Sequence, residues 1–190
     1  MNTSATSAAT EGAPPKAERY EIDIGNMHAS IQFKISHLGF GWMIGRFNRF
    51  SGFFDYAEGH PELDRVSVTI ETGSIDTNHP ERDKHLRSKD FLAVEDYPEA
   101  HFVSTRYEET GEDSAILEGN LTLRGVTRLV RIEVLKLGHG KDPWDAYRRA
   151  FMGSTRLALK DFGIEYDLGP AAREVDLYLN IEGIRQAEAW

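Results

Sequence analysis

The sequence predicts an all-β protein in which about eight antiparallel strands close into a barrel or pack as a sandwich. Many short segments alternate apolar and polar residues, as strands with one buried face do. Short connections rich in glycine, proline and acidic residues separate these segments, and one stretch alone has a helical character. Strands and helices do not alternate along the chain, so a parallel sheet is not expected.

The composition bounds the organisation of the chain and excludes several functions. At 190 residues the chain is expected to hold one domain, and its formal net charge of −9 argues against nucleic acid as a partner. The absence of cysteine excludes disulfides, thiol catalysis and cysteine-ligated metal. Residues 1–19 are expected to be a disordered tail or linker without a signal peptide, residues 20–184 the barrel, and residues 185–190 a C-terminal extension.

The first clear pattern is in residues 27–35, where apolar residues occupy the odd positions. This alternation predicts a strand that buries Phe33 and Ile35. Residues 36–45 follow, with three glycines among five large apolar side chains. This segment is too rich in glycine for a stable helix and too apolar for an ordinary surface loop, so we expect a loop folded over an apolar opening.

Further strands are expected at 46–56, 66–71, 100–109, 117–123, 129–137, 151–159 and 175–181. In residues 129–137 the apolar positions change parity, and a β-bulge near Val134 would reconcile them. The apolar parity of these strands predicts which side chains point into the barrel: Phe33, Ile35, Val68, Ile70, Leu121, Ile132, Leu177 and Leu179.

The helical segment comprises residues 77–91 and is densely charged. Thr77 or Asn78 is expected to cap it, with Pro80 at the first helical position and Glu81 in the first turn. A helix with so few apolar residues cannot lie in a core, so it is expected to cover the mouth of the barrel.

The expected interior is almost purely apolar. A barrel of about eight strands can be filled by its own side chains or can hold one small ligand, and the residues alone leave both possibilities open. The first would be a structural or interaction module with a self-filled core, and the second a ligand-binding protein. Aromatic residues gather around the helical segment and the apolar loop, which favours a ligand.

Several motifs, in conserved order and spacing over residues 20–184, resemble the YceI-like family of polyisoprenoid-binding, lipocalin-like barrels. They are Tyr20-Glu21-Ile22-Asp23, His28-Ala29-Ser30-Ile31-Gln32-Phe33, Ser36-His37-Leu38-Gly39, the whole segment 76–91, Tyr97-Pro98, residues 119–127, Asp142-Pro143-Trp144 and Lys160-Asp161-Phe162-Gly163. The resemblance implies an eight-stranded antiparallel barrel with one short helix and an apolar loop at its mouth. It also implies a bound long-chain isoprenoid lipid, such as a polyprenyl chain or a ubiquinone-like tail, transport or storage without catalysis, and a periplasmic or secreted location.

The residues expected to contact such a lipid come from the inward parity, the apolar loop and the helical segment. They are Phe33, Ile35, His37, Phe40, Trp42, Met43, Phe47, Phe53, Val68, Ile70, Asn78, His79, Arg82, Phe91, Phe102, Leu121, Ile132, Phe151, Leu177 and Leu179. For the polar members the alternative is structural. The charges of the helical segment can form a solvated face with i,i+3 and i,i+4 pairs, and His37 can be a turn residue.

The sequence gives little support for a metal site or a catalytic site. None of the seven histidines forms a His-x-His or His-x-x-x-His pair, and no nucleophile elbow or paired acid has the spacing that chemistry requires. We therefore expect no metal and no catalytic cofactor. The expected partners are the isoprenoid lipid and, transiently, a membrane surface, with the protein a monomer or a dimer.

Overall fold

The structure is a computed structural model that describes residues 15–25 and 28–187. Most of the expected N-terminal tail, and the end of the C-terminal extension, lie outside these residues. Ordered strand reaches from Glu18 to Arg185, slightly beyond the limits of 20–184. The described strands are β1 (Glu18–Ile22), β2 (Ser30–His37), β3 (Gly41–Phe47), β4 (Phe50–Tyr56), β5 (Arg65–Glu71), β6 (Ile75–Asp76), β7 (Glu99–Glu109), β8 (Ser114–Leu123), β9 (Val126–Lys141), β10 (Tyr147–Ala158) and β11 (Glu174–Arg185).

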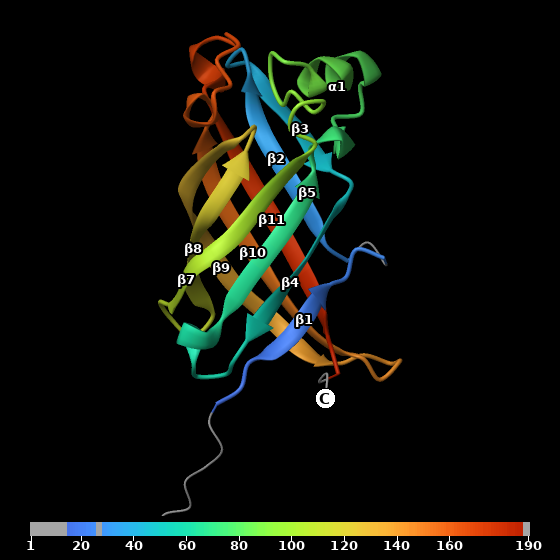
Figure 1. Ribbon diagram of the computed structural model, residues 1–190, viewed down its shortest axis with the longest axis vertical. Coiled ribbons are helices and arrows are strands. Elements are labelled where there is room, and N and C mark those ends of the chain that lie inside the picture. Colours follow the sequence, from blue (N-terminus) through green and yellow to red (C-terminus); the bar gives the residue numbers. More distant parts are fainter. Residues whose placement is uncertain (1–14, 26–27, 188–190) are drawn as a thin grey trace, which may run out of the picture.

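Eight of these strands close into an antiparallel barrel, as Figure 1 shows. Neighbours around the barrel follow the order β1, β4, β5, β7, β8, β9, β10 and β11. Closure comes from β11, which returns to pair with β1 in the register Tyr20 opposite Arg185. From β7 to β11 each strand pairs with the next strand along the chain, as β4 does with β5, so this part of the wall needs no crossover helix.

The wall is extended near one end by β2, β3 and β6. β11 pairs with β1 through residues 183–185 and with β2 through residues 176–180, so β1 and β2 cover successive parts of the same strand. β2 and β3 form a hairpin whose turn contains Leu38, at a positive φ of 54°, and Gly39. The expectation of a loop over residues 36–45 is therefore wrong. Glycine suits the turn, and the apolar residues flanking it form paired strand.

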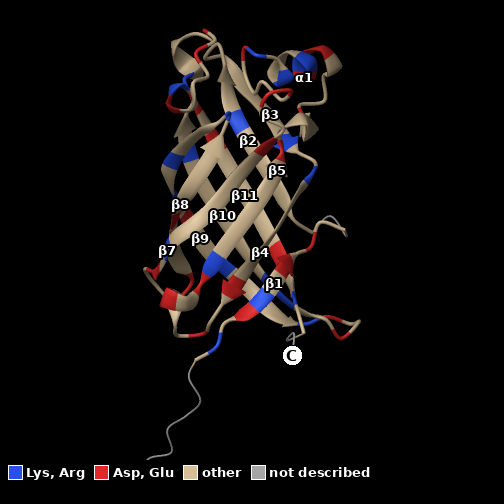
Figure 2. Cartoon of the chain, viewed as in Figure 1, with Lys and Arg blue, Asp and Glu red and all other residues tan. Residues whose placement is uncertain are grey.

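The single described α-helix, α1 (Pro80–Arg87), lies at the same end of the barrel as the β2–β3 hairpin (Figure 1). We call this end the mouth. The N-cap is His79, whose Nδ1 accepts a hydrogen bond from the Arg82 N–H, and not Thr77 or Asn78 as expected. Pro80 occupies the first turn as predicted. Positive and negative residues share the helix surface (Figure 2).

Two side chains attach the helical region to the barrel. Arg87 donates hydrogen bonds to the carbonyl oxygens of Gly73 and Ile75, both at 2.8 Å. Arg124 donates to the carbonyl oxygens of Lys89 and Gly163, which joins the segment after α1 to the 3₁₀ turn at Leu159–Phe162. These bonds satisfy backbone carbonyl groups and fix the position of α1 at the mouth.

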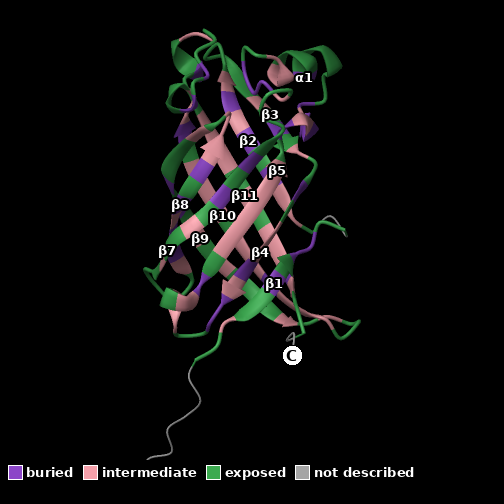
Figure 3. Cartoon of the chain, in the orientation of Figure 1, coloured by how far each residue is buried: buried purple, intermediate pink, exposed green. Residues whose placement is uncertain are grey.

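The strands bury alternate residues, and Figure 3 shows the alternation of buried and exposed colour along them. Buried side chains form clusters inside the barrel, such as the one around Phe102, Leu117 and Ile132. The bulge expected near Val134 lies instead at the register shift where Ala150 pairs with Gly138 and Phe151 with Lys136. Leu135 and Leu137 consequently face outward and are 46% and 48% exposed. No described helix is long and apolar enough to cross a membrane.

Candidate functional site

The barrel encloses two apolar cavities, each of about 140 Å³. The mouth cavity lies between the hairpin, α1 and the upper barrel, with Phe33, Met43 and Leu92 among its lining residues. The deep cavity lies further from the mouth and is lined by residues that include Phe102 and Phe151. Almost all of the exposed lining atoms in both are apolar, so each cavity favours a hydrocarbon occupant over water.

The two cavities adjoin at a set of shared apolar side chains, which we call the partition. Ile31, Ile70, Leu121 and Leu177 line both of them. Each cavity is similar in size to the engineered cavity of about 150 Å³ that holds benzene, so neither alone accommodates a long chain. A long ligand must therefore occupy both spaces and pass the partition side chains.

A cleft of about 800 Å³ opens to solvent at the mouth. Residues of β2 and β3 form one side of it, α1 a second side, and the segment at Tyr166–Gly169 a third. The cleft and the mouth cavity share five lining residues: Ile35, Met43, Leu86, Phe91 and Leu168. The cleft, the mouth cavity and the deep cavity are thus consecutive spaces, and each shares apolar lining residues with the next.

An aromatic cluster stands between the cleft and the mouth cavity. The ring centroids of His85, Phe91 and Tyr166 lie 5.0 Å from one another, and His85 meets the other two edge to face. His85 Nε2 also lies 2.8 Å from Asp90 Oδ2, which fixes the orientation of the imidazole. Tyr166 remains 46% exposed, so this side of the cluster is in contact with solvent.

The structure brings sixteen of the twenty expected lipid contacts together along these spaces. In the deep cavity are Val68, Phe102, Ile132, Phe151 and Leu179, and in both cavities Ile70, Leu121 and Leu177. In the mouth cavity are Phe33 and Phe47, and in both that cavity and the cleft are Ile35, Met43 and Phe91. His37, Trp42 and Arg82 line the cleft alone.

Four expected contacts, Phe40, Phe53, Asn78 and His79, lie elsewhere. Phe40 is at the tip of the hairpin and is 88% exposed. Phe53 faces outward beneath the Arg19 guanidinium, 3.8 Å from the ring centroid, because the inward parity of β4 belongs to Phe54. Asn78 is an exposed turn residue with a φ of 59°, and His79 serves as the cap of α1.

The charged residues of α1 have mainly structural partners. Arg82 donates to the hydroxyl and the carbonyl oxygen of Thr77, at 2.7 and 2.8 Å. Asp83 is buried and accepts hydrogen bonds from the amide and the hydroxyl of Thr77. Arg82 also lines the cleft, as His85 does, so its position suits contact with a bound molecule.

The end of the deep cavity furthest from the mouth contains polar groups that sequence patterning does not reveal. Asp64 and Tyr107 both line the cavity. Asp64 is only 6% exposed, its Oδ1 accepts a hydrogen bond from the Ala57 N–H at 2.7 Å, and burial raises its pKa to about 7. The Tyr107 hydroxyl is buried without a hydrogen-bond partner, and burial raises its pKa.

A cluster with metal-ligand character lies outside the barrel interior. Asp23, His28 and Glu182 each place one potential ligand atom within 4.8 Å of the others. The Arg148 guanidinium already occupies this position and donates to Asp23 and Glu182, both at 2.7 Å. It also donates to Asp142 and so holds the pKa of that carboxyl below its ordinary value. A cation would have to displace the guanidinium.

Fold and site together define a class: a small closed β-barrel whose interior is apolar and whose mouth carries a helix. The profile of the YceI-like domain matches residues 20–183, and the chain belongs to the YceI-like family. It is 56% identical over 170 residues to a UPF0312 protein of Pseudomonas paraeruginosa, which covers 90% of this chain and 88% of that protein. It is 51% identical, with the same coverage, to a UPF0312 protein of Azotobacter vinelandii.

Solved structures share the fold at lower sequence identity. BcnA of Burkholderia cenocepacia superposes with a TM-score of 0.76 at 21% identity, covering 85% of this chain and 98% of that chain. A polyisoprenoid binding domain from Saccharophagus degradans, implicated in plant cell wall breakdown, superposes with a TM-score of 0.66 at 16% identity. That alignment covers 88% of this chain and 98% of the other.

Proposed function

We propose that this protein binds a long-chain isoprenoid lipid in its barrel and stores it or carries it between membranes, without catalysis. The observation that carries the proposal is the series of spaces that leads from the open cleft to two apolar cavities. The structural similarity to a domain described as polyisoprenoid-binding supports the same ligand class. In this proposal the lipid is exchanged in the periplasm, and the ligand is a polyprenyl chain or a quinone tail.

The energetics suit exchange with a membrane. Moving one five-carbon unit from water into the barrel is worth roughly 4 kcal/mol at about 0.8 kcal/mol per carbon. The real alternative for such a lipid is a bilayer, where its chain already lies among hydrocarbons. Transfer from bilayer to barrel therefore changes the free energy little, and the shape of the interior and the contacts of the head group decide which lipid is retained.

The mouth carries the surface through which a lipid would pass. Leu38, Phe40, Trp42 and Ile44 of the hairpin are each at least 60% exposed. They adjoin or line the cleft, and the Lys34 ammonium lies 4.4 Å from the Trp42 ring centroid. An apolar tip flanked by a cation is suited to transient contact with the apolar and anionic parts of a membrane surface.

The partition favours a second candidate, a structural or interaction module with a self-filled barrel. Mass spectrometry of an organic extract of the purified protein separates the two. A co-purifying isoprenoid supports the carrier. An empty extract, together with failure to take up added polyprenol, rejects it.

A variant in the partition makes the test specific. Leu177→Phe adds volume where both cavities meet, so it should reduce the amount of bound lipid while the barrel still folds. The control is Leu129→Phe, the same change on the outer face of β9, where the side chain is 66% exposed. Equal lipid content in both variants would contradict binding in the barrel interior.

A further inference from the structure

The deep cavity ends in a polar group that the fold leaves unsatisfied. Tyr107 lines the cavity, and its hydroxyl has no hydrogen-bond partner although the oxygen is buried. An unpaired buried hydroxyl typically costs about 1–3 kcal/mol. The unpaired Tyr107 hydroxyl lies beside an otherwise apolar cavity, so it is a candidate to form a hydrogen bond with a polar group of a bound ligand.

Tyr107 reaches the interior because of a bulge in β7. Phe102 pairs with Leu121 and Tyr107 with Leu117, and the register shifts between Ser104 and Arg106. The extra residue reverses the parity, so an odd-numbered residue joins the even-numbered Phe102 inside. Bulges commonly redirect a side chain beside a functional site.

Asp64 stands beside Tyr107 at the same end of the cavity. It follows the 3₁₀ turn Pro61–Leu63, and both residues line the deep cavity close enough for the carboxyl charge to act on the phenol. One Asp64 oxygen accepts the Ala57 N–H. Since burial brings the pKa of Asp64 to about 7, the carboxyl occurs in both its neutral and its charged form near neutral pH. The neutral form can donate a hydrogen bond and the charged form accepts one.

We infer that Tyr107 and Asp64 form a subsite for the uncharged, oxygen-bearing head group of the lipid, a hydroxyl or a carbonyl, so that the lipid enters head first. The inference rests on the proposed function and adds the chemistry and orientation of its ligand. The phenol and the carboxyl can donate to and accept from a hydroxyl, and the phenol can donate to a carbonyl oxygen. The chain then extends through the partition towards the mouth.

The surroundings disfavour a phosphate at this subsite. The exposed lining atoms are almost all apolar, so a phosphate would lose its hydration there, and a charged Asp64 would repel it. The nearby cation, Arg149, does not line the cavity. Its guanidinium stacks 3.8 Å from the Tyr56 ring centroid and reaches Glu58 at 3.5 Å. Lys136 pairs with Glu109 at 3.0 Å.

Binding of matched ligands to the delipidated full-length protein tests the inference. The probes are geranylgeraniol, the hydrocarbon in which hydrogen replaces its hydroxyl, and geranylgeranyl monophosphate. The unmodified protein should bind the alcohol roughly tenfold more tightly than the hydrocarbon, the effect of about one good hydrogen bond. It should bind the monophosphate more weakly than the alcohol.

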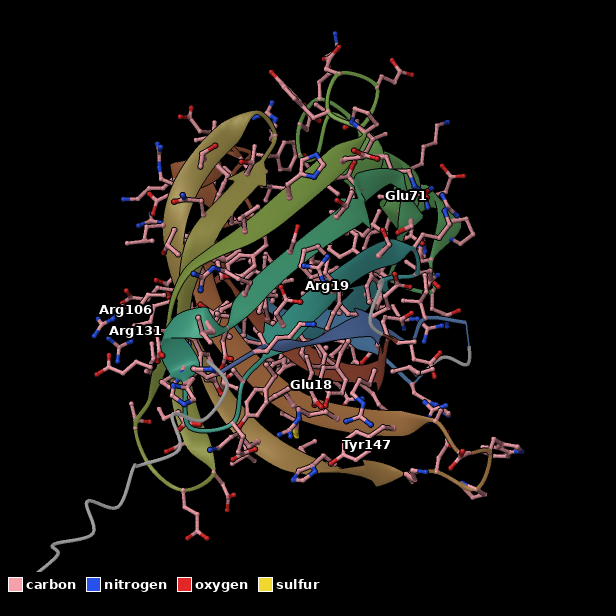
Figure 4. The ribbon with its side chains drawn as sticks, turned by 60° about the horizontal axis from the view of Figure 1, so that its bottom comes forward. Glu18, Arg19, Glu71, Arg106, Arg131 and Tyr147 are labelled. Carbon is pink, nitrogen blue, oxygen red and sulfur yellow. The ribbon has the colours of Figure 1, made fainter. Side chains whose placement is uncertain are left out.

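The decisive variant is Tyr107→Phe, which keeps the ring and removes the hydroxyl. It should lose most of the preference for the alcohol and keep the affinity for the hydrocarbon. The control is Tyr147→Phe, because the Tyr147 hydroxyl is bound to His139 at 2.6 Å and Tyr147 lines neither cavity. Figure 4 shows Tyr147 with Glu18 at the end of the barrel turned towards the viewer.

The outcomes separate the subsite from the proposed function. If the unmodified protein binds hydrocarbon and alcohol equally, or if Tyr107→Phe retains the full preference, the subsite is refuted while lipid binding stands. An equal loss of affinity for both ligands in Tyr107→Phe refutes it too, because the hydroxyl would then act through packing. If no probe binds the unmodified protein, the proposed function and the subsite both fail.

Discussion

Asp64 couples the folding of the far end of the barrel to pH. Its pKa is raised from 3.8 to about 7 by burial, so the folded protein binds more protons than the unfolded chain between these values. The contribution of Asp64 to the free energy of unfolding therefore falls as the pH rises from about 4 to about 7. Asp64→Asn removes the charge and keeps an oxygen to accept the Ala57 N–H. We expect it to flatten this slope and to stabilise the protein above pH 7 by a few kcal/mol.

Urea unfolding of both proteins across this pH range measures the effect. The control is Asp113→Asn in the exposed β7–β8 turn, which should leave the slope unchanged. If the pH dependence of Asp64→Asn matched that of the unmodified protein, the Asp64 carboxyl would be ionised in the folded protein throughout the range.

Closure of the barrel requires a residue without a side chain at position 183, which is Gly183. It lies in β11 where that strand pairs with β1, and an added Cβ would be 2.5 Å from the Phe54 ring and 2.9 Å from Tyr20 Cβ. The Tyr20 and Phe54 rings are stacked with centroids 5.0 Å apart, so neither can yield independently. We expect Gly183→Ala to lower the free energy of unfolding by about 1–3 kcal/mol. Thermal or urea unfolding of Gly73→Ala, where an added Cβ meets nothing within 4 Å, is the control.

Sequence reasoning located the inward residues where strands alternate without interruption. It predicted the interior positions of Phe33, Val68 and Leu177 because a strand places every second side chain on one face. It chose Phe53 where the structure buries Phe54, since the four phenylalanines of residues 46–56 occupy both parities. It missed Tyr107 because the bulge in β7 leaves no mark on the local pattern.

At the scale of elements, the hairpin of β2 and β3 is the part of the wall expected to admit lipid. Trp42 lines the cleft and is 61% exposed, so a carboxylate there adds charge to the path without disturbing a core. We expect Trp42→Asp to slow transfer of a fluorescent polyprenol from vesicles by several-fold and to leave the circular dichroism spectrum unchanged.

Trp144→Asp is the matched control for the hairpin. Trp144 is 80% exposed, in the β9–β10 connection, and lines none of the cavities or the cleft. Its replacement should leave transfer at the unmodified rate. Equal transfer by the two variants would remove the hairpin from the entry path, and equal slowing would point to a general effect of surface charge.

The hairpin and α1 also show which elements sequence can define. The charged segment gave a helix with Pro80 in its first turn, because capping and propensity are local. The cap itself was misassigned because several polar residues precede Pro80. The hairpin was predicted as a loop because its apolar residues line the mouth of the barrel on one side and are exposed on the other.

For the whole molecule, the closed antiparallel barrel was predictable and the state of its interior was not. Alternating strands with short turns allow few topologies, and the resemblance to the YceI-like family selected the barrel. Whether inward side chains fill that barrel depends on their rotamers and on strand register, which periodicity does not encode. The partition of Ile31, Ile70, Leu121 and Leu177 exists only once those strands are assembled.

The two apolar cavities make the stability of the whole barrel depend on whether a ligand is bound. Side chains that line an empty cavity lack dispersion contacts on one side, and a bound chain restores them. A ligand that binds only the folded state adds about 2.7 kcal/mol at a concentration one hundred times its dissociation constant. Delipidated protein should therefore melt at a lower temperature than loaded protein, and added polyprenol should recover the difference.

EDTA should change neither melting temperature, since Arg148 occupies the described cluster of Asp23, His28 and Glu182. If EDTA lowered the melting temperature and delipidation did not, the result would contradict the proposed carrier function and assign the stability to a bound metal.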